Sequence, residues 1–458
     1  MEVITIETSS LGDRSYVLVD GGAAAVIDPQ RDIDRVESLL SERGLRLTHV
    51  FETHVHNDYV TGGLELARRA GAVYVLAAAD VVDYERTGAR DGDEFAVGGV
   101  IVRAVHTPGH TPTHLSYVVL QQGRPVAAFT GGSMLYGTVG RTDLISQHAT
   151  ETLTRAQFRS VRRLAELPGE VRVHPTHGFG SFCSAASTSG LDVSTIDQER
   201  QSNLALTMAD EDHFVSRLLD GLTAYPRYYA QMAPINRAGP APVDLSAPQP
   251  VDPVEIRRRV HAGEWVVDLR SRTVFAGGHL TGTLNLEIGD AFATYLGWTM
   301  QWETPVTLVG DTAAQVAEAQ RQMARIGIDR PAGAANQGIQ TWAAGGEVRS
   351  YRTATFAELA ETVAQDTAAQ DPIVVLDVRR DDEWAAGRLA GAVHIPVQDL
   401  EARLGELPDG EVWVHCASGY RASLAASLLD RAGRSVVAID DDWAAAARYD
   451  TLRITTGD

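Results

Sequence analysis

The sequence predicts an α/β protein in three parts, a mixed α/β sandwich followed by two similar α/β domains. Prolines gather in residues 234–253, which predicts a semi-rigid linker between the sandwich and the rest of the chain. Residues before this linker carry three loops with histidines, and residues after it carry an internal repeat. We expect domains at residues 1–240, 250–347 and 353–458, because 458 residues exceed one ordinary core.

Composition argues against several classes of function. The net charge of −20 would repel nucleic acid and anionic membrane surfaces, so we expect neither as a partner. No apolar run approaches the ~18–20 residues that span a bilayer, and the first residues show no secretory pattern. Two cysteines, Cys183 and Cys416, are too few for a disulfide framework and fit a reducing compartment. We therefore expect a cytoplasmic protein.

Strand and helix patterns are mixed in the first part of the chain. A helical pattern covers residues 33–43. Short apolar runs predict strands near residues 4–7, 16–20, 25–28, 48–52, 101–105, 116–120 and 126–129. A mixture of this kind suits an α/β sandwich whose loops gather at one edge.

Three loops of this first part contain residue types that bind metals. They are Thr53-His54-Val-His56-Asn-Asp58-Tyr59, Thr107-Pro-Gly-His110 and Pro175-Thr-His177. A His-x-His segment that leaves a strand presents two imidazoles, and a Pro-Gly turn places a third. A single histidine is more often a packed or solvated residue, but three loops in this order predict a metal site. The candidate ligands are His54, His56, Asp58, His110 and His177.

The residues after the linker repeat themselves. Residues 268–282 align without gaps on residues 377–391, at a constant offset of 109. In each copy an apolar run leads into Asp-x-Arg, which predicts a buried parallel strand, and a second apolar run precedes an alanine-rich helical pattern. These patterns predict two α/β domains, here called the first repeat (250–347) and the second repeat (353–458).

The second repeat contains the clearest catalytic motif, Val412-Trp-Val-His-Cys416-Ala-Ser-Gly-Tyr-Arg421. It predicts a strand, a short loop and a helix start, so that loop amides, the helix N-terminus and Arg421 favour the thiolate of Cys416. Such a thiolate can accept a sulfane sulfur and carry it as a persulfide. We predict Cys416 and Arg421 as catalytic residues, with substrate contacts from Ala417, Ser418, Gly419, Tyr420 and Arg379.

Two other interpretations of this loop are weaker. A lone cysteine is most often a small buried hydrophobic residue, but Cys416 leaves its strand for a Ser-Gly turn closed by an arginine. Phosphatases place five residues between the cysteine and the arginine, whereas four separate Cys416 from Arg421. The first repeat has Gly310-Asp-Thr312 at the corresponding place and no thiol in residues 250–350, so it cannot carry a persulfide.

The second repeat resembles rhodanese domains. The resemblance is carried by Asp377-x-Arg379, Glu383-Trp, Gly391-Ala-Val-His-Ile-Pro396 and the loop from Cys416 to Arg421. It implies a sulfurtransferase. The first repeat looks like an inactive rhodanese domain that is kept for packing or for shaping a shared cleft.

The histidine loops resemble the metallo-β-lactamase fold, an αββα sandwich that collects His and Asp residues around one or two metals. Phe129-Thr-Gly followed by Gly140-Arg-Thr-Asp143, with the repeats downstream, is similar to persulfide dioxygenases fused to rhodanese. This resemblance implies at most one metal ion per chain. The expected ion is Fe(II), and Zn is the alternative. The resemblance also implies the oxidation of a persulfide to sulfite by O2.

Two positions depart from the pattern of the persulfide dioxygenases. His54 and His110 match that family's two histidine ligands, but Gly132 stands where it has an aspartate, and Tyr59 replaces a histidine. The outcomes that stay open are a two-histidine iron site with a sulfur substrate, a metal-free persulfide-binding domain, and a rearranged site completed by His56, Asp58 or His177.

Together these features predict a sulfurtransferase fused to a persulfide dioxygenase, acting on glutathione persulfide or a similar compound, thiosulfate and sulfite in sulfide detoxification. The main alternative is a rhodanese whose N-terminal domain only binds substrate or supports assembly. A glyoxalase II-type thioester hydrolase ranks last, because Gly132 and Tyr59 replace ligands of its two-metal site. By analogy with relatives of both enzyme types we expect a homo-oligomer. Cys183 is either a small buried hydrophobic residue or a sulfur relay.

Overall fold

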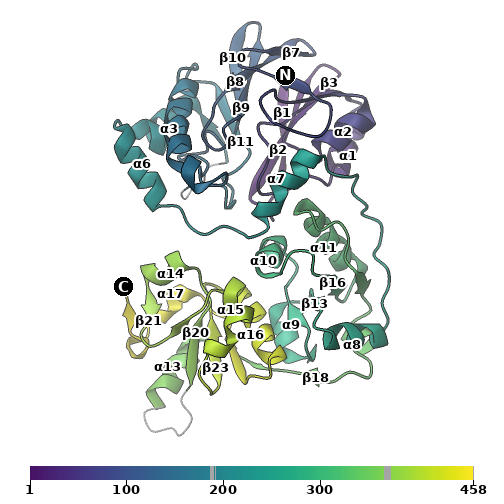
Figure 1. Ribbon diagram of the computed structural model, residues 1–458, viewed down its shortest axis with the longest axis vertical. Coiled ribbons are helices and arrows are strands. Elements are labelled where there is room, and N and C mark those ends of the chain that lie inside the picture. Colours follow the sequence, from purple (N-terminus) through teal and green to yellow (C-terminus); the bar gives the residue numbers. More distant parts are fainter. Residues whose placement is uncertain (186–189, 191, 366–372, 457–458) are drawn as a thin grey trace. The chain divides into compact units, whose positions relative to one another are not determined.

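The computed structural model describes residues 1–185, 190, 192–365 and 373–456 (Figure 1). The chain divides into two compact units. The first consists of residues 1–243 with residues 324–327, and the second of residues 244–323 with residues 328–458. Among the described residues, no helix combines the length and the apolar character that crossing a membrane requires.

The first unit is a sandwich of two six-stranded sheets with helices on both outer faces (Figure 1). The first sheet follows the chain order, with β1 (Glu2–Thr8), β2 (Asp13–Asp20), β3 (Ala23–Ile27), β4 (Arg46–Phe51), β5 (Val73–Ala77) and β6 (Thr87–Ala89). The second sheet has the reverse order, from β12 (Ser194–Thr195) through β11 (Arg172–Pro175), β10 (Arg124–Gly131), β9 (Leu115–Gln121) and β8 (Val100–His106) to β7 (Glu94–Val97).

Hydrophobic side chains from both sheets fill the space between them, among them Phe51, Tyr117 and Phe129. The outer face of the first sheet packs against α1 (Asp34–Glu42), α2 (Gly63–Ala70) and α7 (Tyr229–Ala238). The outer face of the second sheet packs against α3 (Gln147–Leu164), α4 (Ile196–Ser202), α5 (Leu204–Thr207) and α6 (Glu211–Asp220). Strands β2 and β3 are buried along nearly their whole length because both of their faces are covered. The predicted αββα sandwich is confirmed.

The first repeat has a parallel sheet in the order β15-β13-β16-β17. Its elements are α8 (Pro253–His261), β13 (Trp265–Asp268), α9 (Arg272–Gly277), β14 (His279–Leu280), β15 (Leu284–Asn285), α10 (Phe292–Thr299), β16 (Val306–Val309), α11 (Ala313–Arg325), β17 (Gly333–Ala335), α12 (Ile339–Trp342) and β18 (Val348–Arg349). The short strands β14 and β18 pair with each other.

The second repeat has a parallel sheet in the order β19-β24-β23-β20-β22. Its strands are β19 (Arg352–Ala354), β20 (Val374–Asp377), β21 (Arg388–Leu389), β22 (Val393–His394), β23 (Val412–His415), β24 (Val436–Ile439) and β25 (Ile454–Thr455). Its helices are α13 (Phe356–Gln365), α14 (Asp381–Ala386), α15 (Val397–Arg403), α16 (Tyr420–Arg431) and α17 (Trp443–Ala446), with 3-10 turns η2 (Leu404–Glu406) and η3 (Asp450–Leu452).

The predicted repeat is present at the level of single hydrogen bonds. In the first repeat, Arg270 Nη2 lies 2.6 Å from Asp268 Oδ2 and 2.9 Å from the carbonyl O of Gly278. In the second repeat, Arg379 makes the same two contacts, with Asp377 at 2.6 Å and with the carbonyl O at position 387 at 2.7 Å. Each pair therefore fastens the end of a central strand to the turn that follows the next helix, at the predicted offset.

The linker is shorter than the proline cluster predicts. Pro234 lies inside α7, although it has no N–H to bond the carbonyl of the preceding turn. Tertiary contacts hold this helix, because the side chain of Asn236 bonds the backbone of His56, Tyr59 and Thr61. At the other end, Pro253 begins α8 behind an Asp252 cap. The extended segment is therefore residues 239–252, and the prediction of a linker over 234–253 is wrong at its start.

Candidate functional site

Cys416 lies directly after β23, in the turn that leads into α16. The residue is only 2% exposed, and the backbone N–H of Gly419 donates a hydrogen bond to its Sγ at 3.2 Å. Gly419 has a φ of +91°, and a Cβ atom there would lie 2.2 Å from Oδ1 of Asp440. Glycine is required at this position, and its place in the turn keeps an amide directed at the sulfur.

Arg421 forms a two-pronged ion pair with Glu383 of α14. Its Nη1 and Nη2 atoms lie 2.5 and 2.8 Å from the two carboxylate oxygens. Burial disfavours the charged form of Glu383, but hydrogen bonds and charge from Arg421 outweigh it and lower the pKa of Glu383 to about 2. The carboxylate of Glu383 therefore partly neutralises the positive charge of Arg421 that was predicted beside the thiol. The same ion pair connects α16 to α14. Glu383 belongs to a sequence motif, but nothing in the sequence indicates this pairing.

Arg379 makes structural contacts, and its predicted contact with a substrate stays a prediction. Its guanidinium bonds Asp377 and the carbonyl O of Gly387, and it stacks over the ring of Trp443 at 3.6 Å. Among the described residues, no hydrogen bond joins its side chain to residues 416–420. The Asp-x-Arg motif thus fixes the end of β20. This strand pairs with β23, which leads directly into the Cys416 loop.

The first repeat borders the Cys416 loop. The hydroxyl of Tyr420 donates to the carbonyl O of Glu287 at 3.0 Å, and the ring of Tyr295 packs beside that of Tyr420. Arg272 Nε lies 2.7 Å from Oδ1 of Asp440, the carboxylate next to Gly419. The predicted substrate contacts at positions 417 and 418 are half-buried and exposed, respectively. The repeat without a thiol therefore supports the loop that has one.

Three histidines from three loops of the first unit meet at one point. His54 follows β4, His110 follows β8 and His177 follows β11, and all three are fully buried. One ligand atom of each lies within 4.8 Å of the other two. Nε2 of His54 and Nε2 of His177 are 3.4 Å apart. Nε2 of His110 has no hydrogen-bond partner in the part of the chain that the structure describes.

The other ring nitrogen, Nδ1, has a polar neighbour in all three histidines. These neighbours are the carbonyl O of Arg141 for His110 (2.7 Å), Oδ1 of Asp13 for His177 (2.9 Å) and Oγ1 of Thr53 for His54 (2.9 Å). Contacts of this kind fix the orientation of metal-binding histidines. Thr53 belongs to the first histidine loop, but nothing in the sequence indicates its contact with His54, and Asp13 belongs to no recognisable motif.

His56, also predicted as a ligand, turns Nε2 away from this point. That atom lies 2.9 Å from the hydroxyl of Tyr59, 3.2 Å from Oε2 of Glu52 and 3.3 Å from Oδ1 of Asp28. Burial lowers the pKa of His56, but Asp28 and Glu52 outweigh burial and raise it to about 9. The tyrosine at position 59 thus helps to hold His56 in a buried ion-pair network.

Asp58 lies on the outer side of His177. Its Oδ2 is 3.2 Å from Nδ1 of His177, which also contacts Asp13. Burial and the neighbouring carboxylate of Asp58 raise the pKa of Asp13. Among the described residues Asp58 forms a possible ligand group with His56 and His177, but not with the other two converging histidines. The predicted ligands therefore form two groups that share His177, one with His54 and His110 and the other with His56 and Asp58.

Gly132 shows what fills the place of the missing aspartate. A Cβ atom at this position would lie 2.2 Å from Cδ2 and 2.8 Å from Nε2 of His110. The imidazole of His110 therefore occupies the space that any side chain at position 132 would enter. The backbone N–H of Gly132 donates to Nε2 of His114 at 3.0 Å.

The converging histidines fit a single metal ion. Imidazole nitrogens suit Zn, Fe and other transition metals, and the buried, unpartnered Nε2 of His110 is the kind of atom that a metal would satisfy. A cavity of about 420 Å³ is lined by Val55, Asp80, Thr111 and Arg237, among others. Val55 and Thr111 are sequence neighbours of His54 and His110, but the lining contains none of the three histidines.

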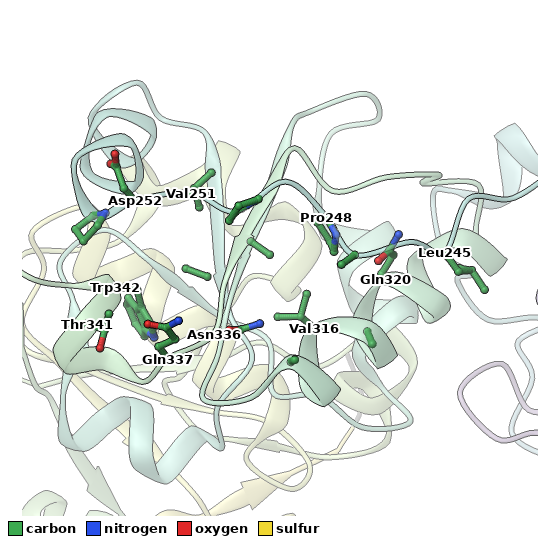
Figure 2. A pocket seen from close by; sticks show the side chains of 17 residues that line it. Leu245, Pro248, Val251, Asp252, Val316, Gln320, Asn336, Gln337, Thr341 and Trp342 are labelled. Carbon is green, nitrogen blue, oxygen red and sulfur yellow. The ribbon is translucent and has the colours of Figure 1, made fainter.

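A larger cavity of about 620 Å³ lies in the first repeat (Figure 2). Val316 and Gln320 of α11 face it from one side, and Leu245, Pro248 and Val251 of the linker from another. Its lining contains none of the candidate site residues. The volume of this cavity is therefore no guide to the chemistry of Cys416.

Cys183 is fully buried in the first unit. Burial raises the pKa of its thiol well above the ordinary value, which disfavours the thiolate that sulfur transfer requires. Its carbonyl O accepts a hydrogen bond from the backbone N–H of Arg141 at 2.8 Å. These surroundings favour the interpretation of Cys183 as a small buried hydrophobic residue.

Comparison with known proteins covers both units. Residues 11–177 match the metallo-beta-lactamase superfamily and residues 357–448 match the rhodanese-like domain. The mitochondrial persulfide dioxygenase ETHE1 of Bos taurus is 32% identical over 208 residues, which are 45% of this chain and 73% of that protein. The Homo sapiens protein of the same name is 31% identical over 208 residues, with the same coverage.

A solved structure extends the similarity beyond the first unit. The metallo-beta-lactamase from Staphylococcus aureus subsp. aureus COL is 27% identical, with a TM-score of 0.66, and the match covers 73% of this chain and 98% of that one. Neither family match extends to the first repeat. The chain belongs to the metallo-beta-lactamase superfamily, with ETHE1-like persulfide dioxygenases as its homologues, and carries a rhodanese-like domain after the metallo-beta-lactamase domain.

Proposed function

We propose that the second repeat transfers sulfane sulfur through Cys416 and that the first unit oxidises a low-molecular-weight persulfide. The observation that carries the first half is the amide of Gly419, directed at Sγ of Cys416 where β23 turns into α16. A fixed N–H donor there stabilises negative charge on sulfur, both in the thiolate and in the persulfide. The rhodanese-like match supports the same chemistry.

The transfer consists of two displacements at sulfur. The thiolate of Cys416 attacks the outer sulfur of thiosulfate, the S–S bond of thiosulfate breaks, and sulfite leaves with the electron pair. An acceptor thiolate then attacks the outer sulfur of the cysteine persulfide, that S–S bond breaks, and the cysteine thiolate returns. No oxidant or reductant is consumed. With glutathione persulfide as the donor and sulfite as the acceptor, the same steps produce thiosulfate.

In the first unit, the buried histidines would hold one ferrous ion, which supplies the redox chemistry with O2 that Zn does not offer. The residues around it bind the carrier and exclude water. The cavity of about 420 Å³ is lined by the apolar side chain of Val55 and the polar side chain of Thr111. Asp80 and Arg237 also line it, and the guanidinium of Arg237 suits a carboxylate of glutathione. Glutathione persulfide is therefore the substrate that we favour.

A second candidate function rests on the altered positions. Gly132 and Tyr59 remove two ligands of the family pattern, which favours a rhodanese whose N-terminal domain binds a persulfide without oxidising it. Thioester hydrolysis of the glyoxalase II type ranks behind both. We further propose small sulfur anions as partners, a homo-oligomeric assembly and a cytoplasmic location.

The experiment that separates these functions measures two activities on one preparation. Protein is loaded anaerobically with Fe(II), and O2 consumption with glutathione persulfide is recorded beside sulfur transfer from thiosulfate. We expect both activities, with O2 consumption lost in His54→Ala and His110→Ala. Sulfur transfer without O2 consumption would select the second candidate, and the absence of both would contradict the proposed function.

A further inference from the structure

We infer that His54, His110 and His177 bind one divalent metal ion through their Nε2 atoms, so that a third histidine stands in for the carboxylate missing at position 132. This ligand set deepens the proposed function of the first unit, because it names the residues that would hold the ion. It differs from every set with a carboxylate ligand in that all three ligands are neutral.

The outer hydrogen bonds fix which ring nitrogen is free. Nδ1 of His110 lies 2.7 Å from a carbonyl O, which can only accept, so Nδ1 carries the proton. The hydroxyl of Thr53 lies 2.7 Å from Oδ2 of Asp28, so its oxygen accepts from Nδ1 of His54. Nδ1 of His177 contacts carboxylate oxygens in the same way. In the neutral form of each ring, Nε2 is therefore unprotonated and carries a lone pair that can bind a metal ion.

These lone pairs face one another in a space that excludes water. Nε2 of His54 and Nε2 of His177 are 3.4 Å apart, and the rings are fully buried. A single proton could bridge that pair, but it would leave Nε2 of His110 without a partner. A metal ion satisfies all three nitrogens at once. Two nitrogens about 2.1 Å from one ion and at a tetrahedral angle lie about 3.4 Å apart, which matches the observed separation.

The other candidate ligands contact different partners through one atom each, while Nδ1 of His56 and Oδ1 of Asp58 have no hydrogen-bond partner among the described residues. Nε2 of His56 is shared among Tyr59, Glu52 and Asp28. Asp58 and Asp13 both contact the outer nitrogen of His177, an arrangement in which carboxylates support a histidine ligand and increase its basicity.

The glycine at position 132 belongs to the same rearrangement. A side chain at this position would collide with the ring of His110 and lie 2.8 Å from its Nε2 atom. An aspartate and the present position of His110 therefore exclude each other. A neutral ligand set also leaves the full charge of the ion uncompensated, which favours an anionic sulfur ligand such as a deprotonated persulfide.

The test is metal binding by the full-length protein, free of activity measurements. Metal-free protein is titrated anaerobically with Co(II), and the stoichiometry, affinity and visible spectrum are recorded. We expect one ion per chain, and a loss of affinity of at least about 100-fold in His54→Ala, His110→Ala and His177→Ala. Asp13→Asn should lower the affinity about 10- to 100-fold, since it removes a supporting carboxylate.

The matched control is His174→Ala. His174 lies on β11, three residues before His177, and packs against Tyr16 and Phe129 outside the cluster. Its replacement should leave the affinity for Co(II) unchanged. Circular dichroism and thermal unfolding of every variant separate lost ligands from lost folding.

Three results would overturn the inference. Wild-type affinity in His177→Ala would place the third ligand elsewhere, and the absence of any Co(II) binding would exclude the site. Gly132→Asp is the most direct comparison. We expect the restored aspartate to lower the affinity for Co(II). A higher affinity would mean that the site still uses the family's ligand positions and has only lost its aspartate. Metal binding without O2 consumption would leave the ligand set intact while contradicting the proposed oxidation.

Discussion

Cys416→Ser is expected to reduce sulfur transfer from thiosulfate by about 10³-fold or more, the largest effect of any single change in this protein. A serine hydroxyl is not ionised near neutral pH and cannot hold a sulfane sulfur as a persulfide. The variant should fold normally, since the two side chains have nearly the same size and the N–H of Gly419 can donate to the serine hydroxyl as it does to the sulfur. The measurement is the steady-state rate of thiosulfate-dependent sulfur transfer to cyanide.

The other cysteine provides the control for this prediction. Cys183→Ser should leave sulfur transfer unchanged, because that thiol is buried in the first unit. Mass spectrometry after incubation with thiosulfate should find one added sulfur atom on the wild type and none on Cys416→Ser. Substantial transfer by Cys416→Ser, or an added sulfur atom on Cys183, would contradict the assignment of the nucleophile.

Asp377→Ala is expected to reduce the free energy of unfolding by about 3–5 kcal/mol, because it leaves the buried guanidinium of Arg379 without its carboxylate partner. Asp268→Ala removes the equivalent partner of Arg270 and should destabilise its own repeat by a similar amount. Denaturant unfolding followed by the fluorescence of tryptophans measures both effects.

The two aspartates differ in what they should do to activity. Asp377 ends β20, which pairs with β23 directly before the Cys416 loop, so its loss should lower sulfur transfer at temperatures where the protein remains folded. Asp268→Ala is the matched control, since it breaks the same contact in the repeat without a thiol. Equal losses of transfer in both variants would mean that the first repeat takes a direct part in the reaction.

The repeat and the histidine loops were predictable from the sequence because each depends on local order. A constant offset of 109 relates Asp268 to Asp377, and parallel strands in corresponding positions place both carboxylates at equivalent strand ends. The order of the histidine loops similarly implies that their side chains meet at one edge of a sandwich. Periodicity and spacing are sufficient for such features.

Features that depend on distant partners were not predictable. Arg421 looks available to a substrate in the sequence, yet Glu383 from another helix binds it. Nothing near Asp13 indicates that it supports His177, 164 positions later. Pro234 suggests a chain break, but the tertiary hydrogen bonds of α7 override that local preference.

The thiol-less repeat also determines how a reaction partner can reach the sulfur. Among residues 416–420, Ser418 is the exposed one, while Tyr420 is tied to Glu287 and Gly419 is enclosed by Arg272 and Asp440. In the proposed transfer, donors and acceptors would therefore approach the sulfur of Cys416 from the side of Ser418. An approach from one side would select against wide acceptors, so we expect sulfite or a small thiol to exchange sulfur faster than a thiol on the surface of another protein.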